Sequence, residues 1–125
     1  MTPMTRPNPE PLTPLSLAIL LALVDEDRHG YGIMKEIERL TDGEVQAGAG
    51  SLYAALQRMT VAGLIDEAPY DPAPDEDARR RYYQLTEQGR ETARAEMLRM
   101  VRALRVARRK RLLPGLRLSV AAADR

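Results

Sequence analysis

The stretch that decides the fold runs from residue 48 to residue 65 and reads GAGSLYAALQRMTVAGLI. Its large apolar residues recur at i, i+4 and i+7, which places them on one face of an α-helix. These residues are Leu52, Leu56 and Met59. Gly48 or Gly50 offers a helix start with bare backbone N–H groups, and Gly63 stands where a left-handed residue commonly ends a helix. The stretch therefore predicts one helix followed by the start of a strand.

The opposite face of this helix is small, polar or cationic. Its members are Gly50, Ala54, Gln57 and Val61, flanked by Ser51 and Arg58. No acidic residue occurs between Val45 and Ile65. A helix that enters a DNA groove needs these properties, because small residues allow close approach and a few donors reach base edges or phosphates. Periodicity alone fits an ordinary amphipathic helix equally well.

Length and composition fit one domain, with at most one long helix added to it. The chain has 125 residues and is 44% hydrophobic, but it contains no Phe and no Trp. A core of this kind is modest, and a chain this short often gains further burial by oligomerising. The absence of Cys excludes disulfides and thiolate metal sites. Because no apolar run has transmembrane length and no signal-peptide pattern is present, we expect a soluble cytoplasmic protein.

The net charge of +1 conceals an asymmetry along the chain. Residues 1–78 hold 5 basic and 14 acidic side chains, whereas residues 79–125 hold 14 basic and 4 acidic ones. The net charge of −9 in the first part argues against DNA binding, since affinity depends on neutralising phosphates. The acidic residues are concentrated in predicted turns, however, and not on the small, polar face of the central helix.

Two helices are expected before the central helix. Thr13 and Pro14 form a typical helix start, and the helix that follows to about Val24 is apolar nearly all round, which suggests that a partner subunit covers its outer face. A second helix follows the His-Gly-Tyr-Gly segment at 29–32. Its predicted core face consists of Ile33, Ile37 and Leu40. Two short helices joined by a turn that contains glycine predict a helix-turn-helix.

Two strands and a long helix are expected after it. Residues 64–70 and 79–85 are predicted to pair as a hairpin wing, joined by an acidic loop. Thr86 is a typical N-cap, and the last helix is expected to run from residue 87 to about Leu112 before Pro114 and Gly115 end it. Its apolar stripe comprises Ala93, Met97, Met100, Leu104 and Ala107, with Val101 at the edge. The basic cluster at 105–111 could complement the helix dipole, be solvated, or contact a phosphate or partner.

The order of these elements and their local sequences resemble the PadR family of bacterial transcriptional regulators. The matching stretches are His29-Gly-Tyr-Gly-Ile33, Gly50-Ser-Leu-Tyr53 with Leu56, Gly63-Leu-Ile65, and Arg81-Tyr-Tyr83 with Leu85-Thr86 and Gly89-Arg90. They cover about residues 15–90, and the length resembles the short subfamily, in which a long final helix makes the dimer contact. The resemblance implies an α+β fold, mainly helical with a small β-hairpin, arranged as a winged helix-turn-helix.

The resemblance also implies a homodimeric repressor that binds a palindromic operator in double-stranded DNA and is released by a small ligand or another signal. The implied dimer and effector cavity lies between the first and last helices. Its candidate residues are Leu20, Met97, Met100, Val101 and Leu104. Some family members stack planar drugs on a Trp in this cavity, and that mode cannot apply to a chain without Trp.

Seven residues are candidates for DNA contact. They are Lys35, Ser51, Tyr53, Gln57, Arg58, Arg79 and Arg80. Gln57 is expected to read a base edge, while Arg79 and Arg80 are expected to contact phosphates because the wing loop itself is acidic. For Tyr53, core packing and DNA contact remain equally open.

Other activities have little support in the sequence. His29 is the single histidine and lacks the further ligands of a metal site, so a structural role is expected. Ser51 has no triad partner beyond it, so we expect no enzyme, cofactor or metal. The domain plan is an arm at 1–12, the winged domain at 13–86, a dimerisation helix at 87–113 and a tail at 114–125. The main alternative is a winged helix that contacts proteins and has no DNA affinity.

Overall fold

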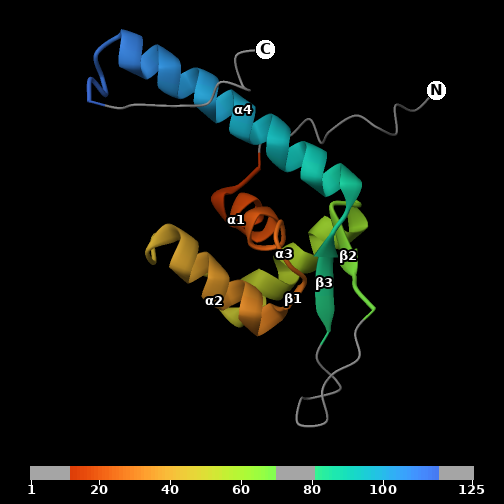
Figure 1. Ribbon diagram of the computed structural model, residues 1–125. Helices are drawn as coiled ribbons and strands as arrows, with labels where there is room; N and C mark the ends of the chain where they lie inside the picture. Colours follow the sequence, from red (N-terminus) through yellow and green to blue (C-terminus); the bar gives the residue numbers. More distant parts are fainter. Residues whose placement is uncertain (1–11, 70–80, 116–125) are drawn as a thin grey trace, which may run out of the picture. The chain divides into compact units, whose positions relative to one another are not determined.

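The computed structural model describes residues 12–69 and 81–115, in which helices surround a small antiparallel sheet (Figure 1). The predicted α+β class, mainly helical with a small sheet, is confirmed. Contacts divide the chain into two units within the last helix, the N-terminal unit ending at Ala93 and the C-terminal unit beginning at Arg94. The predictions for the arm, the wing loop at 71–78, Arg79, Arg80 and the end of the tail fall wholly or mostly outside the described residues.

Helix α1 spans Pro14–Ala22 and starts as predicted. The Thr13 hydroxyl accepts a hydrogen bond from the Ser16 amide at 3.0 Å, and Pro14 occupies the first turn, where no intrahelical donor is needed. The helix stops before the predicted end at Val24, and its exposed side is narrower than expected. Residues Ala18, Ile19, Leu20, Ala22 and Leu23 are buried.

Helix α2 spans Gly30–Thr41 and follows a two-residue strand β1, Arg28–His29, that was not predicted. Ile33 and Ile37 are buried as expected, but Leu40 is 44% exposed, which corrects the predicted core face. The buried side includes Glu36 instead. The inner face is therefore rotated from the 33–37–40 stripe toward residue 36, where ion pairs compensate the buried charge.

Helix α3 spans Ala49–Val61, with Gly48 at its N-cap. Leu52, Leu56 and Met59 are buried, which confirms the predicted core face, and Ala55 joins them. Gly63 has a φ of +83°, and the amide of Leu64 donates to the carbonyl of Met59 at 3.0 Å. This is the Schellman arrangement that favours glycine, so the helix ends where the sequence predicted.

The sheet has the strand order β1-β3-β2 and is antiparallel throughout. Strand β2 spans Ile65–Glu67 and strand β3 spans Tyr82–Leu85, and they pair with Ile65 opposite Leu85 and Glu67 opposite Tyr83. Both strands are shorter than predicted within the described residues. The central strand β3 joins the start of α2 to the exit of α3, so the wing is attached to both helices of the helix-turn-helix.

Helix α4 spans Glu87–Arg109 and ends earlier than the predicted Leu112. Arg111 adopts a left-handed conformation with φ +64°, and the Leu112 amide donates to the Ala107 carbonyl at 2.8 Å. An arginine thus takes the position that Gly115 was expected to provide. In the part of the chain that the structure describes, no helix combines the length and apolar character needed to cross a membrane.

One core holds the N-terminal unit together. Helices α2 and α3 both contact α1, and β2 continues from α3 along the same apolar centre. The largest side chains with almost no exposure are Ile19, Leu20, Ile33, Ile37, Leu52, Leu56 and Ile65. Aliphatic packing therefore fixes α3 by its inner face and leaves its outer face exposed.

Candidate DNA-binding surface

The outer face of α3 is exposed over the whole length of the helix. Its members are Gly50, Ser51, Ala54, Gln57, Arg58 and Val61, and Val61 is 83% exposed. Among the described residues, the side chains of Gln57 and Arg58 make no hydrogen bond or ion pair within the chain. Donors that are not committed internally remain available for base edges and phosphates.

Tyr53 combines the two roles that the sequence left open. Its ring lies against Gly30 at the start of α2, where an added Cβ would come within 2.2 Å of the Tyr53 hydroxyl. Even so, 51% of the residue is exposed. Packing on Gly30 therefore joins the first turns of α2 and α3, while the rest of the side chain lies at the surface.

Lys35 lies on the outer side of α2, as predicted, with 60% of its side chain exposed. Its ammonium group is 3.9 Å from the Glu38 carboxylate and 5.6 Å from the centroid of the Tyr31 ring. Tyr31 is itself 55% exposed. A cation beside an exposed aromatic ring and phenol gives α2 a small surface suited to a phosphate group.

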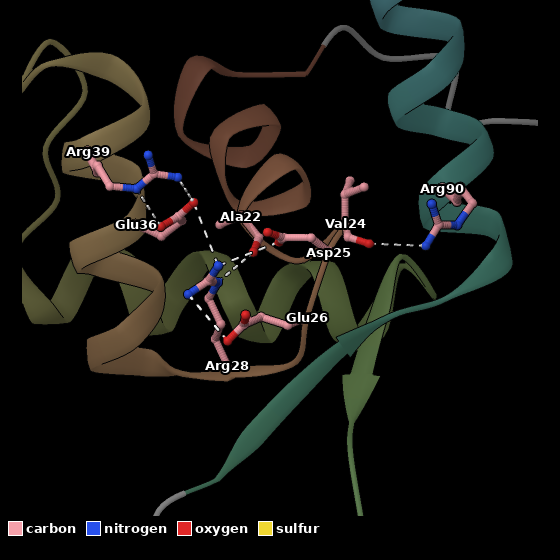
Figure 2. A network of polar contacts seen from close by, with 8 residues as sticks. All are labelled: Ala22, Val24, Asp25, Glu26, Arg28, Glu36, Arg39 and Arg90. Carbon is pink, nitrogen blue, oxygen red and sulfur yellow. Dashed lines mark hydrogen bonds and ion pairs between the residues drawn. The ribbon is translucent and has the colours of Figure 1, made fainter.

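A network of charges on the inner side of α2 positions that helix (Figure 2). Glu36 accepts two hydrogen bonds from Arg39, at 3.0 and 2.6 Å, and lies 3.6 Å from Arg28. Arg28 also donates to the carbonyl of Ala22 at 2.8 Å. The Arg39 hydrogen bonds lower the pKa of Glu36 below its usual 4.5, against the opposing effect of burial, with the charge of Arg28 assisting. The network ties the end of α1, strand β1 and α2 together.

The sequence contained a signal for this network that the apolar periodicity obscured. Glu36 stands three residues after Ile33 and directly before Ile37, so it belongs to the inner face. Arg39 follows at the i+3 spacing that allows an ion pair on one helix. A carboxylate on a predicted core face with an arginine one turn later is a pattern that can be searched for.

His29 has a structural role, as expected. Its Nδ1 accepts a hydrogen bond from the Gly32 amide at 3.0 Å and so caps α2, and its ring meets the edge of Tyr82 at 5.1 Å between centroids. Across residues 12–69 and 81–115, no group of three or more His, Cys, Asp or Glu side chains could hold a metal ion.

The exit of α3 is joined to the start of α4 through Thr86. Its hydroxyl lies 2.6 Å from the Gly63 carbonyl and 2.9 Å from the Leu64 carbonyl, and it accepts from the Gly89 amide at 2.9 Å. Gly89 has to be small, since an added Cβ would lie 2.0 Å from the Leu64 oxygen. Thr86 thus acts as the predicted N-cap and also anchors the wing.

The residues proposed for the dimer and effector cavity fall in different settings. Leu20 has no exposed surface and belongs to the core of the N-terminal unit, so it is not available to a partner in this conformation. Met97, Val101 and Leu104 are partly buried along α4, and Met100 is 41% exposed. The exposed apolar residues near the end of α1 are Leu21 and Val24, which the sequence analysis did not select.

Comparisons with known proteins agree on one family. The model of the transcriptional regulator PadR-like family matches residues 19–95. An uncharacterized protein of Lysinibacillus sphaericus is 36% identical over 76 residues, which are 61% of this chain and 68% of that protein.

Solved structures show the same fold. A PadR family transcription regulator from Clostridium difficile is 26% identical, with a TM-score of 0.61 over 80% of this chain and 99% of that one. Bacillus subtilis PadR in complex with operator DNA is 22% identical, with a TM-score of 0.58 over 70% of this chain and 48% of that one. The family match covers the helix-turn-helix, the sheet and the start of α4, and the chain therefore belongs to the PadR-like family of transcriptional regulators.

Proposed function

We propose that this protein is a sequence-specific DNA-binding regulator whose helix α3 enters the major groove. The observation that carries the proposal is the contrast between the two faces of α3. The inner face is buried and apolar, whereas the outer face is exposed and small, with uncommitted donors in Gln57 and Arg58. A rigidly mounted helix with this outer face suits base recognition. Bacillus subtilis PadR, which shares the fold, has been solved with operator DNA.

Base reading and phosphate holding are assigned to different residues. Gln57 is proposed to pair with an adenine edge, flanked by Ser51 and Arg58. Phosphate contacts are proposed for Lys35 and Tyr53 and for Arg79 and Arg80 on the wing, the last two from their place in the sequence alone. Side chains at helix ends and wings commonly meet the DNA backbone, which positions the protein without reading sequence.

A mobility shift with the DNA upstream of the protein's own coding region tests the proposal. Binding should be tighter than to random DNA of equal length. Changing Arg79 or Arg80 to Ala should weaken binding to both DNAs alike and make the salt dependence shallower by about one unit of slope per lost contact. A loss of discrimination from these wing variants would mean that the two roles are interchanged.

We further propose that the regulator acts as a homodimer on a palindromic operator, as a repressor released by a small ligand or another signal. The apolar stripe of α4, with Met97, Met100, Val101 and Leu104 partly exposed, supports a partner contact. Methionine side chains adapt to varied ligands, so the same stripe is a suitable wall for an effector cavity. Light scattering at micromolar concentration tests the dimer, and a melting-temperature screen with planar phenolic compounds tests the effector.

A winged helix that binds proteins is the second candidate, and the charge of the N-terminal unit favours it. The described residues up to Ala93 hold eleven acidic and six basic side chains, a net charge of −5. This charge opposes phosphate binding in general. If no upstream DNA is bound at low salt while the protein still dimerises, the protein-contact function replaces the DNA-binding one.

A further inference from the structure

The two units of this chain carry opposite charge. Between Arg94 and Gly115 there are eight basic side chains and one acidic one, a net charge of +7, against −5 for the described part of the N-terminal unit. Two copies of the distal part of α4 placed side by side would juxtapose these like charges, which costs several kcal/mol at an interface. A dimer built only on α4–α4 contact along this part is therefore electrostatically disfavoured.

The basic residues of α4 form a band beside its apolar stripe. At 100° per residue, the positions of Arg94, Arg102, Arg105 and Arg109 fall within about a quarter of the helix circumference. The neighbouring sector holds Met97, Val101 and Leu104. A helix face that is apolar in one sector and cationic in the next fits a partner surface with apolar and acidic parts in the same arrangement.

The basic band ends in a hollow suited to carboxylates. Near the end of α4, a surface hollow of about 230 Å³ is lined by Arg105, Arg108 and Arg109. Guanidinium groups bind carboxylates through paired hydrogen bonds and lose less hydration than ammonium groups when they do so. The hollow therefore selects an acidic side chain over an apolar one.

The N-terminal unit offers a complementary surface at the end of α1. Leu21 and Val24 are 37% and 40% exposed, and the turn Asp25-Glu26-Asp27 follows them directly. The side chains of Asp25 and Glu26 are each 65% exposed. Their intrachain partner Arg28 lies 3.5 and 3.7 Å away and is shared with Glu36, so the turn keeps a surplus of negative charge (Figure 2).

We propose that the distal part of α4 docks on the α1 end and acidic turn of a second copy of the chain, with the arginine hollow receiving carboxylates of that turn. This inference rests on the proposed homodimer and names its contact. The apolar stripe then meets Leu21 and Val24, and the cations meet Asp25, Glu26 and Asp27. In a twofold dimer this contact occurs twice, because each copy offers both surfaces.

Charge reversal in the full-length chain tests the contact. The basic-end variant carries Arg108→Glu and Arg109→Glu, and the acidic-turn variant carries Glu26→Lys and Asp27→Lys. Each variant alone brings like charges together at both contacts and should weaken its homodimer about tenfold or more. An equimolar mixture should restore a dimer, since each contact then joins opposite charges. The control variant Asp66→Lys with Glu67→Lys applies the same charge change on β2 and should leave dimerisation unchanged.

Sedimentation over a concentration series, with fluorescence transfer between labelled variants, measures these dimers. The wild-type dimer should also weaken as salt rises. The proposal is overturned if the mixture associates no better than either variant alone, or if both variants dimerise like the wild type. Reduced DNA affinity of the basic-end variant with an unchanged dimer would assign the arginines to phosphates instead. A wild-type monomer that still binds its upstream DNA would remove the dimer and leave the DNA-binding function standing.

Discussion

Helices α2 and α3 are neighbours of almost equal length, with 12 and 13 residues, but they use charge in opposite ways. Helix α2 carries four charged residues, and each makes an ion pair within the chain. Helix α3 carries one, Arg58, which makes no such pair among the described residues. The charges of α2 thus hold the fold in place, whereas α3 keeps its polar groups for an external partner.

The largest effect should come from breaking the α2 network. Changing Glu36 to Gln removes the carboxylate that compensates Arg28 and Arg39, and should reduce the free energy of unfolding by about 2–4 kcal/mol. Urea unfolding measures this loss. The control Glu38→Gln affects only the exposed pair with Lys35 and should cost less than about 1 kcal/mol. Equal losses for the two variants would show that the inner network has no special weight.

The next effect concerns α3 and should appear in DNA recognition while stability is unchanged. Changing Gln57 to Ala should reduce discrimination between operator and random DNA by about 1–3 kcal/mol if the base contact is bidentate. Competition mobility shifts measure the ratio. Gln88→Ala, an equal truncation at the start of α4, serves as the control and should keep the discrimination. A Gln57 variant that loses stability and retains discrimination would reverse the assignment.

A smaller effect tests the link between the two helices. In Gly30→Ala the new methyl group would meet the Tyr53 ring, so the ring has to move and the variant should lose about 1–2 kcal/mol of stability. The double variant with Tyr53→Ala removes the clash, so adding Gly30→Ala to Tyr53→Ala should cost little further. Chemical denaturation of the four chains completes the cycle. Additive losses would mean that Gly30 and Tyr53 do not interact.

The smallest effect is a pH dependence. Because the folded chain holds the pKa of Glu36 below its usual 4.5, the folded state binds fewer protons than the unfolded state as pH falls past that value. The contribution of Glu36 to stability is therefore present above about pH 4.5 and is lost progressively below it. Melting temperatures of the wild type and Glu36→Gln should converge as the solution is acidified. A constant difference at all pH values would contradict the assignment.

The sequence allowed α3 to be predicted closely because all its determinants are local. Leu52, Leu56 and Met59 set the inner face, and Gly63 supplies the left-handed end. The candidate DNA-binding residues on α3 were found for the same reason, since the outer face follows once the inner one is known. Family resemblance added the wing and the function, which periodicity could not supply.

The errors arose where tertiary contacts decide. Leu40 was placed in the core because it continues a helical stripe, but α2 buries Glu36 once Arg28 reaches it from another element. Strand β1 has two residues and exists through its pairing with Tyr82 and Tyr83, so no alternation marks it. Leu20 was selected for a partner surface because α1 looked apolar all round, whereas α2 and α3 enclose that side.

Thr86 couples two parts of the molecule in a mechanical sense. One hydroxyl proton is shared between the carbonyls of Gly63 and Leu64, while the same oxygen holds the Gly89 amide. With Gly89 packed directly on the Leu64 carbonyl, the first turn of α4 cannot rotate without displacing the end of α3 or breaking these bonds. Torque applied to the start of α4 is thereby transmitted to the helix proposed to read DNA, through a joint with very little backlash.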